Sequence, residues 1–218
     1  MPPAHDPRPR NTIAAELCAV GRRGYERGLF AGSDGNISVR VAPDRVLITP
    51  TNVCKGTLDP ATLVVIDLDG RPVDVPAGSA VTSEQRVHTA IYRRRPDAVA
   101  VVHTHSPHAT AFCVARAPLP TDLHPEAAYH FGHVPLVPYL RPGTDALADA
   151  VAAALGDTTA ALLMASHGPV TLGASLLDAY HRAEMLEHYC HVLSITRRIA
   201  EPVPLTADEL RELRPTPA

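Results

Sequence analysis

Three histidines at the ends of apolar runs are the residues of this sequence that point most directly to chemistry. His103 and His105 follow the valine-rich run that starts at Ala98, and His167 follows a second apolar run that starts at Ala160. A short valine-rich run predicts a buried strand, on which side chains two residues apart share a face. Three imidazoles with an open fourth position are typical of a catalytic zinc site. The alternative is a pair of hydrogen-bonded core histidines.

Glu84 is the acidic residue most suited to work beside such a metal. We expect Ser83 to cap a helix that continues through Val87, Ile91 and Tyr92. The helix dipole stabilises a carboxylate at this position, which would explain Glu84 without any function. In the functional interpretation, Glu84 is an oxygen ligand of the metal or a general base beside it. A base next to a Lewis acid suits reactions that move protons to or from carbon.

A binding site for an anion is predicted from three short polar segments. The glycine-rich turn over residues 32–36 offers backbone N–H groups that can cradle an anion. Hydroxyl groups follow at Thr49, Thr51, Thr82 and Ser83, and Ser83 precedes a predicted helix, where phosphates bind. Ordinary turns use the same residue types, so a purely structural role stays open for each segment.

The composition excludes several classes of protein. The 218 residues carry a net charge of −3, and Arg93–Arg95 is the one tight basic run, which we expect to be a solvated helix end. Such a charge distribution does not favour nucleic-acid binding. The four cysteines are far apart, which indicates a reducing compartment, and no apolar stretch is long enough to span a bilayer. We therefore expect a cytoplasmic protein that binds neither nucleic acid nor membrane.

Strands and helices alternate along the chain without a regular period. Residues 1–10 are rich in proline and charge and predict a disordered lead, and residues 11–218 predict one domain. Asn11 or Thr12 is expected to cap the first helix, and residues 118–131 are expected to be irregular. This order of elements favours a mixed sheet that is covered on both faces. The predicted strands cover residues 37–41, 45–49, 63–67, 98–103, 134–137 and 160–164, and further helices are expected to start at Pro107, Thr144, Ser175 and Thr206.

Six motifs occur in order between about residue 12 and residue 200, and together they identify a resemblance. With them the chain resembles the class II aldolase/adducin family, and within it the fuculose-phosphate aldolases. The motifs are Gly32-Ser33-Asp34-Gly35-Asn36, Thr49-Pro50-Thr51, Ser83-Glu84 with His88, His103-Thr104-His105, Pro142-Gly143-Thr144 and Ser166-His167-Gly168.

The resemblance implies a fold, an assembly and a set of roles. It implies a three-layer α/β/α domain with a mixed, largely antiparallel sheet, and a homotetramer with active sites between subunits. It implies a divalent metal, usually Zn²⁺, although Co²⁺ or Mn²⁺ would also suit these ligand types. His103, His105 and His167 correspond to the metal ligands, and Glu84 corresponds to a residue that both reaches the metal and acts as acid and base. Gly35, Asn36, Thr51, Asn52, Thr82 and Ser83 correspond to the positions that bind the substrate phosphate.

Two departures from the family pattern concern the substrate. Asn52 stands where the family commonly has a glycine, and asparagine is the next most tolerant residue if the local φ is positive. The tyrosine that protonates the leaving group in fuculose-phosphate aldolases falls near His124 here, and Tyr129 follows five residues later. His124 and Tyr129 are therefore the proposed proton donors, and Glu126, His130 and His133 are further candidates.

The resemblance predicts a metal-dependent lyase. The preferred reaction is cleavage of a ketose 1-phosphate, such as L-fuculose 1-phosphate or a 5-deoxyribulose 1-phosphate, to dihydroxyacetone phosphate and an aldehyde through a metal-bound enediolate. The alternative is a decarboxylase of the same family that acts on a phosphorylated keto or hydroxy acid. Segments shared with that branch are Leu58-Asp59-Pro60, residues 134–139 and Arg141-Pro142-Gly143. A non-catalytic binding module, like the adducin head, is disfavoured because all three histidines and Glu84 are present.

Overall fold

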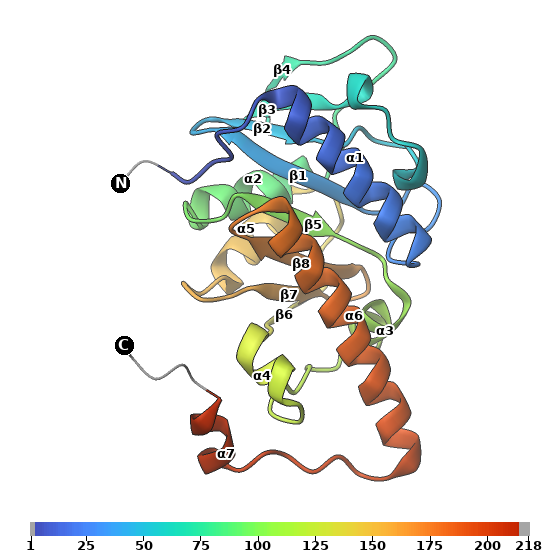
Figure 1. Cartoon of the computed structure of the whole chain (residues 1–218), viewed down its shortest axis with the longest axis vertical. Helices are drawn as coiled ribbons and strands as arrows, with labels where there is room; N and C mark the ends of the chain where they lie inside the picture. Colours follow the sequence, from blue (N-terminus) through green and yellow to red (C-terminus); the bar gives the residue numbers. More distant parts are fainter. Residues whose placement is uncertain (1–2, 214–218) are drawn as a thin grey trace.

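One sheet runs through the whole computed structural model, which describes residues 3–213 (Figure 1). Its eight strands lie in the order β4-β3-β2-β1-β5-β8-β7-β6. Neighbouring strands are antiparallel except β6 and β7, which are parallel. The predicted mixed, largely antiparallel sheet is therefore confirmed. The strands are β1 (Asn36–Ala42), β2 (Arg45–Ile48), β3 (Val64–Asp67), β4 (Pro72–Asp74), β5 (Ala100–His103), β6 (Leu136–Val137), β7 (Ala161–Met164) and β8 (Gly168–Gly173).

Helices cover both faces of this sheet and complete three layers. On one face, α1 (Arg10–Glu26) and α6 (Leu176–Ile199) pack against the strands, and on the other face α2 (Gln85–Arg94) and α5 (Asp145–Ala154) do so (Figure 1). The shorter helices α3 (Pro107–Ala115) and α4 (Pro125–Phe131) pack with the second half of α6 and with β7, and α7 (Ala207–Glu212) follows near the C-terminus. No helix among residues 3–213 combines the length and apolar character that crossing a membrane requires.

The central strand β5 explains why its sequence is apolar without alternation. Ala100 and Val102 face the core under α1 and α6, whereas Val101 faces the core under α2 and α5. A strand that is buried on both faces needs apolar residues at every position. β5 ends at His103, which lies opposite Asn36 of β1 and Val170 of β8. The end of β5 therefore meets the starts of two neighbouring strands at one edge of the sheet.

Several predicted helix caps are present, and two are not. Thr144 accepts a hydrogen bond from the Leu147 N–H, Ser175 caps α6, and Thr206 forms a capping box with Glu209. The first helix begins at Arg10, with Pro9 at the cap position, so neither Asn11 nor Thr12 caps it. Helix α2 begins at Gln85, with Glu84 rather than Ser83 at the cap position and no side-chain cap bond.

Strands β4 and β8 and helix α4 are absent from the predicted elements, and for the last two the reason is identifiable. Strand β8 begins and ends with glycine and contains Pro169, so its apolar run is short, but it pairs with β5 and β7 on both sides. Helix α4 lies inside residues 118–131, which we expected to be irregular. Its seven residues are too few for a helical period to stand out, and it buries Ala127 and Phe131.

The N-terminal lead differs from its prediction. The composition predicts disorder for residues 1–10, but residues 3–9 run along the domain, with the Ala4 N–H donating to the Pro96 carbonyl and the Asp6 N–H donating to the Arg40 carbonyl. Asp6 is 7% exposed and pairs with Arg8. These backbone hydrogen bonds join the N-terminal segment to distant parts of the chain, and amino-acid composition gives no information about such contacts. Residues 1 and 2 lie outside the described part of the chain.

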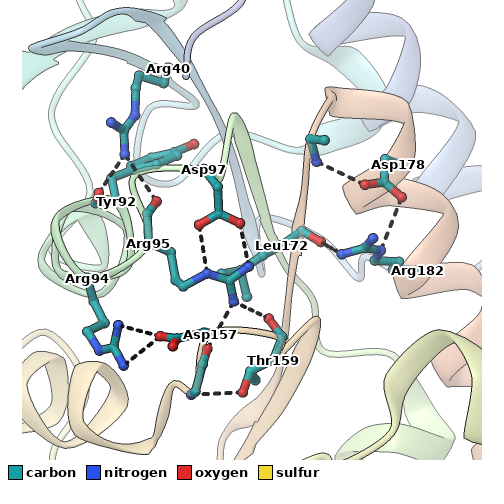
Figure 2. Close-up of polar contacts among 12 residues, drawn as sticks. Arg40, Tyr92, Arg94, Arg95, Asp97, Asp157, Thr159, Leu172, Asp178 and Arg182 are labelled. Carbon is teal, nitrogen blue, oxygen red and sulfur yellow. Dashed lines mark hydrogen bonds and ion pairs between the residues drawn. The ribbon is translucent and has the colours of Figure 1, made fainter. Parts of the chain in front are cut away.

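The run Arg93–Arg95 is only partly solvated. Figure 2 shows Arg95 turned inward, where it pairs with Asp97 at 2.6 Å and donates to the carbonyls of Gly156 and Thr159 at 3.1 and 2.7 Å. Arg95 is 8% exposed, whereas Arg94 reaches the exposed Asp157. The prediction of a solvated helix end is therefore wrong for Arg95, which fastens the end of α2 to the segment before β7.

Candidate functional site

The three predicted ligand histidines meet at the edge of the sheet where β5 ends. The Nε2 atoms of His103 and His105 are 3.0 Å apart, and one ligand atom from each of the three histidines lies within 4.8 Å of the others. His103 ends β5, His105 lies two residues beyond it, and His167 lies in the turn between β7 and β8. The ring centroid of His167 is 4.8 Å from that of His103 and 5.3 Å from that of His105. Such a trio is able to bind one metal ion.

Hydrogen bonds and burial prepare these rings to act as ligands. The Nδ1 of His103 lies 2.9 Å from the Pro169 carbonyl and donates to it, which leaves Nε2 as an acceptor directed at the other two histidines. The Nδ1 of His105 faces the Asp34 carboxylate at 3.5 Å. Burial lowers the pKa of all three histidines, that of His167 to about 4. Neutral imidazoles, which are the form that binds metals, therefore prevail at neutral pH.

Glu84 points at the histidines and not back along its helix. Its Oε2 lies 3.9 Å from the Nε2 of His103 and 3.8 Å from the Nε2 of His167, which is too far for hydrogen bonds. This oxygen is buried and has no hydrogen-bond partner within residues 3–213. Burial raises the pKa of Glu84, and the Gly143 N–H opposes that shift. A cation between this oxygen and the histidines would satisfy it, so the donor set fits a divalent metal.

The predicted phosphate-binding residues line one cavity beside the histidines. The cavity has a volume of about 230 Å³. Asn52 has a φ of 58°, so it adopts the left-handed conformation that the family's glycine would favour, and its side chain lines the cavity. The cavity also brings together Gly35, Asn36, Thr51, Thr82, Ser83, Glu84 and the three histidines.

A buried hydrogen-bond network orients Asn36 toward this cavity. His88 is fully buried, and burial lowers its pKa to about 3, so the ring is neutral and has one donor and one acceptor. Ser38 Oγ donates to His88 Nδ1 at 2.6 Å, and His88 Nε2 donates to Asn36 Oδ1 at 2.5 Å. The Asn36 amide oxygen is thereby occupied, and its NH₂ group is left to donate into the cavity.

The predicted proton donors do not join this site. Tyr129 is 57% exposed and lines a different cavity with His130 and Leu210. The Nδ1 of His124 lies 3.1 Å from the Glu126 carboxylate, and neither residue lines the cavity of the histidines. Within one chain, neither side chain therefore reaches the wall of the histidine cavity.

Two further residues line the cavity, and of these Lys55 was not singled out in the sequence. Asp34 faces His105, although its motif pointed to phosphate binding. Lys55 also lines the cavity, and it is the only lysine of the chain, which is a signal that the sequence already carried.

Comparisons with known proteins show which proteins this chain is similar to. The family model of the class II aldolase and adducin N-terminal domain matches residues 15–194. The chain is 36% identical to the 3-oxo-tetronate 4-phosphate decarboxylase of Escherichia coli K12 over 93% of its own length and 95% of that protein. It is also 36% identical to an L-fuculose phosphate aldolase of Escherichia coli O6:H1, over 92% and 91% of the two chains.

A solved structure supports the same assignment. YgbL from Klebsiella pneumoniae, a candidate aldolase, epimerase or decarboxylase, superposes with a TM-score of 0.87 at 34% identity and covers 95% of this chain and 100% of that one. The fold and the histidine trio are thus those expected from the motifs. By sequence and by structure, the chain belongs to the class II aldolase and adducin family.

Proposed function

We propose that this protein is a metal-dependent lyase that cleaves a carbon–carbon bond in a phosphorylated sugar or sugar acid. The observation that carries the proposal is the buried Oε2 of Glu84, which has no hydrogen-bond partner in the described part of the chain. It faces His103 and His167 beside a cavity lined by amide and hydroxyl groups. The three histidines and Glu84 would hold a divalent cation, for which Zn²⁺ is proposed and Co²⁺ or Mn²⁺ also suit the ligands. Such a cation would stabilise negative charge that develops on substrate oxygen atoms.

The residues around the cation would divide the remaining work. Glu84 would transfer a proton to or from the reacting carbon or hydroxyl group, which typically contributes about 10²–10⁴-fold to the rate. The Asn36 amide, the hydroxyl groups of Thr51, Thr82 and Ser83, and the loop around Gly35 and Asn52 would bind the phosphate. Since the cavity is small and lined by these donors, the substrate would be held by its phosphate end.

Decarboxylation of a phosphorylated 3-oxo acid is the first candidate reaction. When carbon dioxide leaves, the bonding electron pair is delocalised onto the 3-oxo group, and the carbon then takes one proton, which Glu84 would deliver. For 3-oxo-tetronate 4-phosphate the products are carbon dioxide and dihydroxyacetone phosphate. Carbon dioxide leaves from a carboxylate without any proton transfer to or from the leaving group, which agrees with a cavity that neither His124 nor Tyr129 lines.

Aldol cleavage of a ketose 1-phosphate, the reaction preferred from the sequence, is the second candidate. Relatives of both kinds are 36% identical to this chain, so identity does not separate the two reactions. Aldol cleavage also yields dihydroxyacetone phosphate, and the leaving group is an aldehyde. In the cleavage direction, the hydroxyl group on the carbon that becomes the aldehyde must lose its proton. The group that accepts this proton, and returns it in the reverse reaction, would have to come from a neighbouring subunit, where His124 or Tyr129 would be available.

Labelled substrates distinguish the candidates. We would incubate metal-loaded protein with carboxyl-¹³C-labelled 3-oxo-tetronate 4-phosphate and detect ¹³CO₂, and in parallel with L-fuculose 1-phosphate and detect dihydroxyacetone phosphate. Release of ¹³CO₂ that Glu84→Gln abolishes would support decarboxylation, and cleavage of the ketose phosphate would support the aldolase. If the protein retains metal but does neither, and does not exchange a C3 hydrogen of dihydroxyacetone phosphate in D₂O, the proposal is wrong.

We also propose that the protein works as a cytoplasmic homotetramer with active sites between subunits. The separation of His124 and Tyr129 from the histidine site within one chain supports this assembly. All four cysteines are free, which agrees with a reducing compartment.

A further inference from the structure

Lys55 is an unusual cation for this chain. All other basic side chains are arginines, and Lys55 is the only lysine. Its side chain is 1% exposed, and it begins the short 3₁₀ helix Lys55–Thr57 directly after the loop that carries Thr51 and Asn52. Lysine is rarely buried unless its charge is compensated, so its place in the cavity wall calls for a partner.

The Lys55 ammonium group joins the two loops that form the wall of the cavity. Its Nζ donates to the Ser33 carbonyl at 2.5 Å and to the Val53 carbonyl at 2.9 Å. Ser33 precedes Gly35 and Asn36, and Val53 follows Thr51 and Asn52. An ammonium group has three donors, so one N–H is left after these two bonds.

No carboxylate within residues 3–213 forms an ion pair with Lys55. The charged and titratable groups that face it are Asp34, Cys54 and His105, and Asp34 turns its carboxylate toward His105. Burial lowers the pKa of Lys55 to about 8, and Asp34 and Cys54 oppose that shift. Lys55 is therefore mostly protonated at neutral pH. Its hydrogen-bond acceptors within residues 3–213 are the two carbonyl groups, and Asp34 adds electrostatic attraction without a direct ion pair.

We propose that Lys55 binds the anionic end of the substrate with its remaining N–H, while its two carbonyl bonds hold the loops of residues 33–36 and 50–53 at the spacing that a phosphate group requires. The inference rests on the proposed function, in which this cavity receives a phosphate. A compact ammonium fits between two carbonyls and an anion, whereas the planar guanidinium of arginine is built for paired, coplanar acceptors. This difference gives a physical reason for a lysine at this one position.

Matched variants test the inference with inorganic phosphate as the probe. Isothermal titration at pH 7 would compare the parent protein with Lys55→Met, with Lys55→Arg, and with Arg22→Met, which removes one positive charge from an exposed position of α1. The Lys55→Met variant is expected to bind phosphate at least about tenfold more weakly, since a hydrogen bond to a charged group is lost. Lys55→Arg is expected to fall between, and Arg22→Met to match the parent protein.

Measuring metal content distinguishes a failure of the Lys55 proposal from a failure of the proposed function. Each protein would be titrated with metal loaded and after chelation, so that phosphate bound to the metal is distinguished from phosphate bound beside Lys55. Lys55→Met is expected to retain the metal. Equal phosphate affinity in this variant and the parent would overturn the role of Lys55 and leave the proposed function standing. If the parent protein itself binds no phosphate, the phosphate end of the proposed function fails as well.

A second measurement needs no substitution and therefore does not depend on the folding of a variant. Lysine labelled with ¹³C at Cε gives one side-chain resonance, because Lys55 is the only lysine. Its titration midpoint is expected near 8 in the free protein and higher in saturating phosphate, since a bound anion favours the ammonium form. A midpoint that phosphate does not move would contradict the inference.

Discussion

At the scale of single residues, the histidine trio makes the most direct prediction. Replacement of His103 by alanine removes the ligand that is held by the Pro169 carbonyl, and two imidazoles with Glu84 would remain. We expect His103→Ala to lose stoichiometric metal, measured by mass spectrometry of the purified protein, while the fold is retained. His181→Ala is the control, because His181 is exposed on α6. Unchanged metal content in His103→Ala would contradict the site.

Also at this scale, His88 makes stability depend on pH. Its pKa is lowered to about 3 by burial, against about 6.5 in an unfolded chain. Between these values the unfolded state binds more protons than the folded state, so stability falls as the pH falls from 6.5 toward 3. The contribution is about 1.4 kcal/mol per pH unit within this window.

Denaturant unfolding of His88→Gln and the parent protein, both with chelator, checks this prediction. The variant is expected to show a smaller decrease in the free energy of unfolding on acidification. His103, His105 and His167 shift in the same direction but are present in both proteins, so the difference isolates His88. If the free energy of unfolding depends on pH equally in both proteins, protonation of buried His88 does not destabilise the fold and the prediction is wrong.

At the scale of elements, the approach of the residue 32–36 turn to β5 positions the site. Gly35 has a φ of +73°, and a Cβ at this position would lie 2.7 Å from the His103 carbonyl oxygen and 2.7 Å from the Phe30 ring. Gly28 has nearly the same φ, +74°, but a Cβ there would meet no atom of residues 3–213 within 4 Å. Substitution of Gly28 therefore measures the cost of the left-handed backbone conformation alone, whereas substitution of Gly35 adds the cost of a steric clash.

We expect Gly28→Ala to cost about 1 kcal/mol of unfolding free energy, because only the left-handed conformation is penalised. Gly35→Ala should cost about 3 kcal/mol, because overpacking adds to the same penalty, and it should also weaken metal retention. Chemical denaturation and metal analysis of both variants measure these effects. Similar costs for the two variants would mean that the Gly35 contact is easily relaxed.

At the scale of the whole molecule, the proposed assembly makes its own prediction. Sedimentation velocity should give a particle of four chains, each of 23.2 kDa. If Tyr129 or His124 serves a neighbouring site, hybrids of His103→Ala subunits with Tyr129→Phe or His124→Gln subunits should regain activity that neither parent variant has. The regained fraction follows from the mixing ratio, since one intact site forms wherever two complementary subunits meet. A monomer would contradict the proposed assembly, and hybrids without recovery would show that neither Tyr129 nor His124 serves a neighbouring site.

Local sequence patterns predict some elements of this fold and miss others. The valine run of β5, the Thr144 and Ser175 caps and the Thr206 capping box are local features, and the structure contains them where expected. Strand β8 and the ordered N-terminal segment depend on partners elsewhere in the chain, and both were missed. Strand β8, which has glycine at both ends, is stabilised by backbone hydrogen bonds to β5 and β7 on either side of it. The strand propensity of its own residues does not reveal these partners.

The sequence by itself determined the family and the mixed three-layer fold, and it offered the three histidines and Glu84 as candidate site residues, because short motifs with fixed spacing can be recognised in the chain without its structure. Only the tertiary structure decided that Glu84 faces the histidines and that Asn36 is oriented by His88. It also decided that Lys55 bridges two loops and that His124 and Tyr129 lie elsewhere. These are relations between segments tens of residues apart, and packing and hydrogen bonding between distant segments set them, whereas the local pattern sets only which residues are available.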